Sequence, residues 1–271
     1  MSRGERILQW ARMRGLGLLC LFLAGVSYGG DQQFATIGDF PLASGQTIRD
    51  CRLGYRTDGT LSDDRSNVVV VLTWFGGKSA SLASSIGPGK MFDTDRWYVV
   101  TIDALGNGVS SSPSNSSIQP GVSFPRFTIG DMVRSQHQLL TRVLKLERVH
   151  AVAGSSMGGM QALQWAVSYP GFMRHVVAIT GTPRQTSHDL LLWKTQLDLL
   201  ESFSDSREGL RRAMRGVAGI QMLELWTPSW IVKTIEPENI DERLERQREF
   251  LLTLDPFDYM AQLRAMLGDL A

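Results

Sequence analysis

A glycine-flanked serine between an apolar run and a helical pattern is the feature that most restricts the fold of this chain. Residues 149–153 are mostly apolar, which predicts a buried strand, and residues 157–169 predict a helix. Gly154, Ser156 and Gly158 occupy the turn between them as Gly-x-Ser-x-Gly. A strand that turns this sharply into a helix leaves no room for side chains two residues either side of the serine. The pattern predicts a strained strand-turn-helix unit that presents the Ser156 hydroxyl.

This turn places the serine at a helix N-terminus, where the partial positive charge favours a developing negative charge. The arrangement resembles the nucleophile elbow of serine enzymes with an α/β-hydrolase fold. The alternative interpretation is an ordinary Gly/Ser-rich loop between a strand and a helix. The flanking patterns, together with a third glycine at Gly159, favour the elbow with Ser156 as the catalytic nucleophile.

Composition narrows the classes of function. The chain has 271 residues and a formal net charge of +1, which suits one sizeable domain, or one domain with a lid. The near-neutral charge gives no reason to expect a nucleic-acid partner. Cys20 and Cys51 are the two cysteines, and no Cys/His cluster has metal-binding spacing. We therefore expect no metal and no cofactor.

The first 29 residues have the pattern of a secretory signal peptide. Arg3, Arg6, Arg12 and Arg14 make a basic start, an apolar run covers residues 16–26, and small residues follow. The run is too short to span a bilayer comfortably, so we expect no stable membrane insertion. We predict an exported protein, periplasmic or secreted, whose mature chain keeps Cys51 alone. The alternative is an uncleaved N-terminal anchor.

Strand and helix patterns alternate through residues 30–183, which predicts an α/β core with a mostly parallel sheet and helices on both faces. Residues 31–42 are expected as a short lead-in. The predicted strands are 46–57, 68–72, 97–103, the elbow strand and a buried strand at 175–180, and a helix is predicted over 128–145.

Residues 184–271 change character and predict a helical lid or insert. No β-branched run with strand flanks occurs there. Helical patterns cover residues 190–200, 207–217, 220–226 and 242–254.

Several segments are similar to the homoserine O-acetyltransferase group of α/β-hydrolases. These are residues 54–61, 65–67, 103–108, 131–136 and 154–166. The resemblance covers roughly residues 40–200 and, more loosely, the helical region. It implies acyl transfer from a small ester or thioester through an acyl-enzyme, with Ser156 as nucleophile and a histidine and an acid as its partners. It also implies an oxyanion hole made by the backbone amides of Met157 and Trp74.

Three departures from that group bear on the reaction. In this fold the acid and the histidine follow two later strands, and the given sequence stops at Ala271 without showing them. Leu72 and Leu197 stand where the acetyltransferases carry a histidine and a substrate-binding arginine. A leader would also carry the protein away from acetyl-CoA. These departures favour an exported esterase-like enzyme over homoserine acetylation.

The four histidines offer no clear base. His188, next to Asp189, is a conceivable base, but both residues are better explained as polar surface residues of the first lid helix. His137 fits a packing or surface role, and His150 and His175 lie on strands away from the serine. We assign no catalytic role to any of them.

Without later strands, residues 175–180 would form an open sheet edge, and a homodimer is one way to cover such an edge. We expect the sequence to be a truncated reading frame or a fragment of a longer protein. A third hypothesis is a non-catalytic relative that binds a ligand or partner through its open edge and lid.

Overall fold

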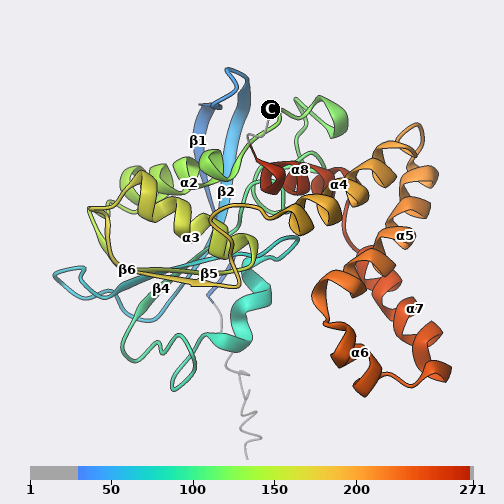
Figure 1. Cartoon of the computed structure of the whole chain (residues 1–271). Coiled ribbons are helices and arrows are strands. Elements are labelled where there is room, and N and C mark those ends of the chain that lie inside the picture. The colour runs from blue at the N-terminus through green and yellow to red at the C-terminus, as the bar shows by residue number, and fades with distance from the viewer. Residues whose placement is uncertain (1–29, 269–271) are drawn as a thin grey trace, which may run out of the picture.

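The computed structural model describes residues 30–268, so the predicted leader at residues 1–29 lies outside the described residues. Figure 1 shows a twisted sheet beside a separate group of helices, which agrees with the predicted α/β core and helical lid. The strands, in chain order, are β1 Gln33–Pro41, β2 Thr47–Asp58, β3 Val68–Leu72, β4 Tyr98–Ile102, β5 Val149–Ser155 and β6 Met173–Ile179. Their order across the sheet is β1-β2-β4-β3-β5-β6, parallel from β4 to β6 and antiparallel at β1 and β2.

The central strand β3 explains how the sheet is covered. All five of its residues are buried, as its unbroken apolar sequence predicts. Val68, Val70 and Leu72 belong to the main core beneath α2 (Ile129–Gln138) and α3 (Met157–Ser168), which lie on the same face of the sheet (Figure 1). Val69 and Val71 belong to a smaller cluster on the opposite face. Leu72 pairs with both Ile102 and Gly154, so the carboxyl ends of β3, β4 and β5 meet at one edge.

Residues 31–42, expected only as a short lead-in, contain a strand that was not predicted, β1. Gln33 pairs with Tyr55 of β2, and the register shifts on both sides of Gly38, which has φ 76°. That irregularity breaks the alternation by which a strand is recognised in sequence. The strand β1 is therefore recognised from its pairing with β2 in the structure and not from its own sequence.

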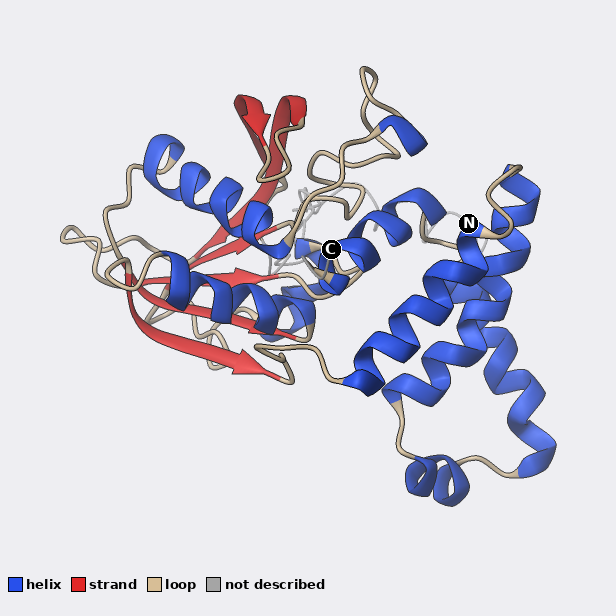
Figure 2. Ribbon diagram, turned by 45° about the horizontal axis from the view of Figure 1, so that its top comes forward, coloured by secondary structure: helices blue, strands red, loops and turns tan. Residues whose placement is uncertain are grey.

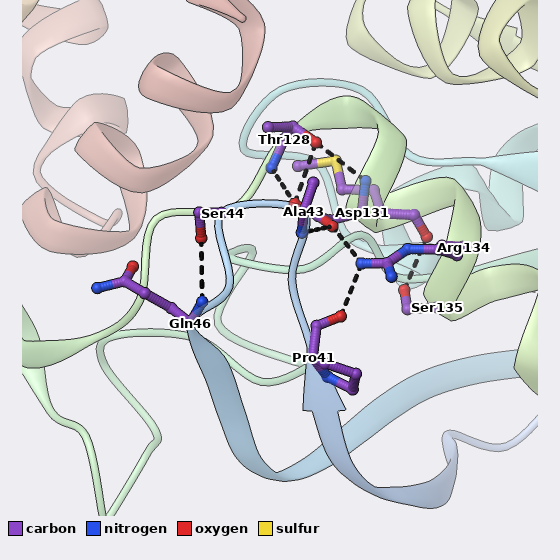
Figure 3. Close-up of polar contacts among 9 residues, drawn as sticks. Pro41, Ala43, Ser44, Gln46, Thr128, Asp131, Arg134 and Ser135 are labelled. Atoms are coloured by element: carbon purple, nitrogen blue, oxygen red, sulfur yellow. Dashed lines mark hydrogen bonds and ion pairs between the residues drawn. The ribbon is translucent and has the colours of Figure 1, made fainter. Parts of the chain in front are cut away.

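The helix predicted over residues 128–145 is present with a change of type. Thr128 caps α2 through a reciprocal capping box with Asp131, and residues Leu139–Val143 continue as a π-helical turn. Asp131 also accepts a hydrogen bond from the Ala43 amide at 3.0 Å and pairs with Arg134, which donates to the Pro41 carbonyl (Figure 3). One buried carboxylate thus ties α2 to the β1–β2 hairpin.

The lid residues are helical, as predicted, with different boundaries. The patterns at 207–217 and 220–226 form a single helix, because α5 runs through Gly216 and Gly219 without a break. A Cβ at Gly216 would lie 3.0 Å from Leu199, so this glycine permits close packing on α4. The helices of this region are α4 Ser187–Glu201, α5 Arg207–Leu225, α6 Pro228–Thr234, α7 Ile240–Leu251 and α8 Pro256–Leu267 (Figure 2), and α6 and α8 were not predicted.

Strand β6 differs in burial from its prediction. It pairs with β5 alone among the described residues, so the expected open edge is confirmed. The expected burial is wrong, because Val177 and Ile179 remain 45% and 47% exposed. These two side chains line an apolar groove of about 710 Å³ on the face of the sheet opposite α3.

The helices within residues 30–268 include none with the length and apolar character that a membrane span requires.

Candidate active site

Ser156 occupies the sharp turn between β5 and α3 that the sequence predicts. Its backbone has φ 54° and ψ −122°, a region that non-glycine residues rarely adopt, and its side chain is exposed. The Ser156 amide donates to the Ile179 carbonyl at 2.9 Å, and the Ser156 carbonyl accepts the Met160 amide at 3.0 Å. The strained turn is therefore held by the end of β6 on one side and by the first turn of α3 on the other.

The two elbow glycines are required by space. A Cβ on Gly154 would lie 2.2 Å from the Gly158 carbonyl oxygen, and a Cβ on Gly158 would lie 2.6 Å from the Leu72 oxygen. Both contacts are with backbone, which cannot rotate away. The glycines therefore let β5, α3 and the end of β3 approach one another around Ser156.

Two backbone amides near this turn are free to bind an anion. Met157 is the first residue of α3, and its N–H has no acceptor among residues 30–268. Trp74 begins a tight turn after β3 in which the Gly77 amide donates to the Trp74 carbonyl at 2.9 Å, and the Trp74 N–H also lacks an acceptor within that part of the chain. Because Leu72 pairs with Gly154, this turn follows β3 at the edge of the sheet where Ser156 lies.

The loop of residues 73–79 is anchored by a buried carboxylate. Asp103 accepts the Ser79 amide at 2.7 Å and the Ser79 hydroxyl at 2.8 Å. Asn107 donates to Asp103 at 2.9 Å and to the Gly77 carbonyl at 3.0 Å, and Gln32 donates to Asp103 at 3.1 Å. From the sequence we expected Asp103, which follows a strand, to fix its own local turn; the hydrogen bond from Asn107 agrees with that, and the contacts with Ser79 in the loop of residues 73–79 are additional.

His137 and His150 pack against aromatic rings and do not contact Ser156. His137 stacks on Tyr169 with ring centroids 3.8 Å apart, and burial lowers its pKa below the ordinary value. The ring centroids of His150 and Trp97 lie 4.3 Å apart, and the pKa of His150 is lowered first by burial and then by its electrostatic interaction with His175. A neutral imidazole fits both environments.

The other two histidines also leave Ser156 without a partner. His175 lines the apolar groove with His150, and His188 is exposed at the start of α4. Asp189 is engaged in the capping box of that helix with Thr186. None of the four histidines, all of which lie in the described part of the chain, hydrogen-bonds to Ser156. A general base for Ser156 is thus not supplied by these residues.

The remaining candidate positions are apolar or structural. Leu72 is fully buried at the end of β3, and Leu197 packs from α4 against the main core. Cys51 is a buried free thiol whose pKa burial raises to about 12. Within residues 30–268, no group of three His, Cys, Asp or Glu side chains is arranged to hold a metal ion.

The amino-acid sequence is similar to a known family and to characterised proteins. The family described as alpha/beta hydrolase fold matches residues 67–213. The chain is 35% identical over 202 residues to ethyl acetate hydrolase from Pseudomonas veronii, covering 73% of this chain and 58% of that protein. It is 42% identical over 160 residues to homoserine O-acetyltransferase from Methanohalophilus mahii, covering 53% of this chain and 33% of that protein.

The fold is also similar to those of solved structures. The acetyl esterase MekB superimposes with a TM-score of 0.82 at 27% identity, over 88% of this chain and 73% of that one. The chain spans about three fifths of the length of ethyl acetate hydrolase and a third of that of the acetyltransferase.

Proposed function

We propose that this chain, which belongs to the alpha/beta hydrolase fold family, is an exported, esterase-like enzyme that transfers acyl groups from small esters or thioesters. The observation that supports it most directly is the exposed Ser156 at φ 54°, together with the amides of Met157 and Trp74, which have no acceptor within residues 30–268 and lie at the same edge of the sheet. The relatives named for ethyl acetate and acetyl ester hydrolysis support the substrate class.

The proposed reaction begins when Ser156 Oγ bonds to the substrate carbonyl carbon and its proton passes to a base. The carbonyl oxygen then carries the negative charge, and the amides of Met157 and Trp74 stabilise it, each contributing about 3 kcal/mol. The bond from carbon to the leaving oxygen or sulfur breaks, the leaving group takes a proton, and an acyl-enzyme remains. Water completes the hydrolysis. The family resemblance implies a histidine as base, a role that none of the four histidines fills in the described structure.

A fluorophosphonate probe and p-nitrophenyl acetate, applied to the full-length protein, test this proposal. We expect covalent labelling at Ser156 and ester hydrolysis, with both lost in Ser156→Ala. Ser155→Ala is the matched control, because Ser155 is the adjacent hydroxyl and lies 3.4 Å from the Thr180 hydroxyl. Labelling or hydrolysis that survives in Ser156→Ala would contradict the assignment. Failure of the wild-type protein to label or hydrolyse would favour the non-catalytic hypothesis.

The runner-up is a homoserine O-acetyltransferase-type enzyme, which the 42% identity to such a protein supports. Leu72 and Leu197 weigh against it, since neither side chain can bind a carboxylate or a polar substrate group. Incubation with acetyl-CoA and homoserine separates the two functions. We expect no O-acetylhomoserine, and its formation would reverse the order of the two proposals.

Export and self-association belong to the same proposal. The basic start and the apolar run at residues 16–26 support a cleaved leader, and the open edge of β6 supports pairing with a second copy. N-terminal sequencing of protein recovered outside the cytoplasm tests the leader. Light scattering of the purified protein tests the homodimer.

A further inference from the structure

A continuous chain of buried polar side chains connects helices α2 and α3 to the loop of residues 73–79, which carries the Trp74 amide. Trp165 and Gln161 lie on α3 and Gln136 lies on α2, and all three are almost completely buried. The Trp165 indole donates to the Gln136 side-chain oxygen at 2.9 Å, and the Gln136 amide nitrogen donates to the Gln161 oxygen at 2.6 Å. The Gln161 amide nitrogen then donates to the Thr73 carbonyl at 3.1 Å and to the Met157 carbonyl at 3.2 Å.

The direction of this chain is fixed by its two ends. An indole nitrogen can only donate, so the Gln136 oxygen must face Trp165 and its nitrogen must face Gln161. At the other end, the carbonyl oxygens of Thr73 and Met157 can only accept. Gln161 therefore has a single orientation that satisfies all of its neighbours, with its nitrogen directed at Thr73.

The Thr73 carbonyl belongs to the same peptide group as the Trp74 N–H. No peptide bond among the described residues is cis, and in a trans peptide the C=O and N–H point in opposite directions. Gln161 holds the carbonyl toward the body of α3, so the Trp74 N–H points away from that helix body. This is the N–H that has no acceptor within residues 30–268.

The other contacts of the loop act on different peptide groups. Gln262 on α8 accepts the Gly76 amide at 2.8 Å, Asn107 donates to the Gly77 carbonyl, and Asp103 binds Ser79. These contacts fix where the loop lies, whereas Gln161 fixes how the peptide of residues 73 and 74 is rotated. Burying an amide side chain costs free energy unless its polar atoms are paired. The side-chain nitrogen and oxygen of Gln136 and of Gln161 all have partners, and the chain ends at the carbonyls of Met157, in α3 itself, and Thr73, in the loop.

We propose that Gln161 is a positioning residue that aims the Trp74 N–H at the oxygen that becomes negatively charged during acylation of Ser156. This inference rests on the proposed function, because it assigns Gln161 to the oxyanion hole of that reaction. Gln161 does not touch the substrate. It acts through the Thr73 carbonyl, and its effect appears in the transition state, where the oxyanion forms, rather than in substrate binding.

Gln161→Met tests the proposal, because methionine fills a similar volume and cannot donate to Thr73. We expect the rate constant of fluorophosphonate labelling and kcat for p-nitrophenyl acetate to fall about 10- to 100-fold, less than the complete loss of an oxyanion donor. KM should change less than about twofold, since ground-state binding is not affected. Gln196→Met is the matched control: it makes the same change at a buried glutamine of α4 whose partners are Glu224 and Tyr259, and it should label at the wild-type rate.

The outcomes separate this inference from the function on which it rests. Loss of labelling in Ser156→Ala with an unchanged rate in Gln161→Met would overturn the positioning role and leave the serine enzyme intact. Equal losses in Gln161→Met and Gln196→Met would overturn it as well, since any buried glutamine would then have the same effect. If Gln161→Met does not fold, Gln161→Glu keeps an acceptor for Gln136 and, assayed at a pH where its carboxyl group is ionised, points an oxygen that cannot donate at Thr73. A wild-type rate in that variant would refute the proposal, and a fall in kcat with KM retained would support it.

Discussion

Adding one methyl group at Gly154 should separate the geometry of the elbow from the chemistry of its serine. The backbone of Gly154 has no positive φ, so alanine is acceptable there on conformational grounds. The obstacle is space, because its Cβ would lie 2.2 Å from the Gly158 oxygen and 2.3 Å from the Gly158 carbonyl carbon. Since real Cβ contacts are essentially never closer than 3.0 Å, the strand and the helix must separate by at least 3.0 − 2.2 = 0.8 Å.

This displacement sets the expected size of the effect. Overpacking costs about 1–3 kcal/mol, and we expect about 3 kcal/mol here because the opposing atoms are backbone. A misplacement near 1 Å at a reacting group costs about 100-fold in rate, so fluorophosphonate labelling of Gly154→Ala should slow by about that factor. Urea unfolding and labelling kinetics measure the two effects separately.

Gly171→Ala is the matched control for this substitution. Its Cβ would have no atom within 4 Å and its φ is not positive, so stability should change by less than about 0.5 kcal/mol and labelling should not change. Wild-type stability and labelling in Gly154→Ala would refute the close approach of β5 and α3. So would an equal loss in Gly171→Ala.

Two further predictions concern buried carboxylates. Asp103→Asn replaces an acceptor that faces Ser79 with a donor and should lower the free energy of unfolding by about 2–3 kcal/mol and slow labelling, whereas exposed Asp63→Asn should do neither. Burial raises the pKa of Asp258, which accepts two hydrogen bonds from Ser114, to about 6. The folded state thus prefers the protonated acid, and its stabilising contribution is complete below pH 4 and lost as the pH rises through about 6. The span from about 4 to about 6 corresponds to about 3 kcal/mol. Asp258→Asn should remove that pH dependence in urea unfolding between pH 4.5 and 7.5, and an unchanged slope would contradict the raised pKa.

Local patterns predicted the elements that depend on neighbours in sequence. The run at Val68–Leu72 is apolar because both faces of β3 are covered, so its sequence alone identifies it. The elbow could also be predicted from the sequence, because the two glycines around Ser156 are required wherever a strand turns this sharply into a helix. Helix α4 followed from its periodicity, with Thr186 and Asp189 supplying a cap that lies within four residues of sequence.

Other features depended on partners distant in sequence. Strand β1 forms because β2 pairs with it across a hairpin, and α5 continues through Gly216 because α4 packs closely against it. The length of β6 was underestimated and its burial overestimated, since burial depends on what covers a strand and not on its own apolar residues. The family resemblance supplied Trp74 as a candidate donor, but no pattern linked Gln161 to it.

The sequence by itself determined where the chain bends around Ser156, because that bend is decided by residues two apart and by the absence of their side chains. Tertiary structure decided what surrounds the serine: which peptide N–H groups stay without acceptors, which buried amides orient them, and that the four histidines lie in packed or exposed positions elsewhere. Those outcomes depend on contacts between segments as far apart as residues 73 and 161, and one-dimensional spacing carries no record of such contacts.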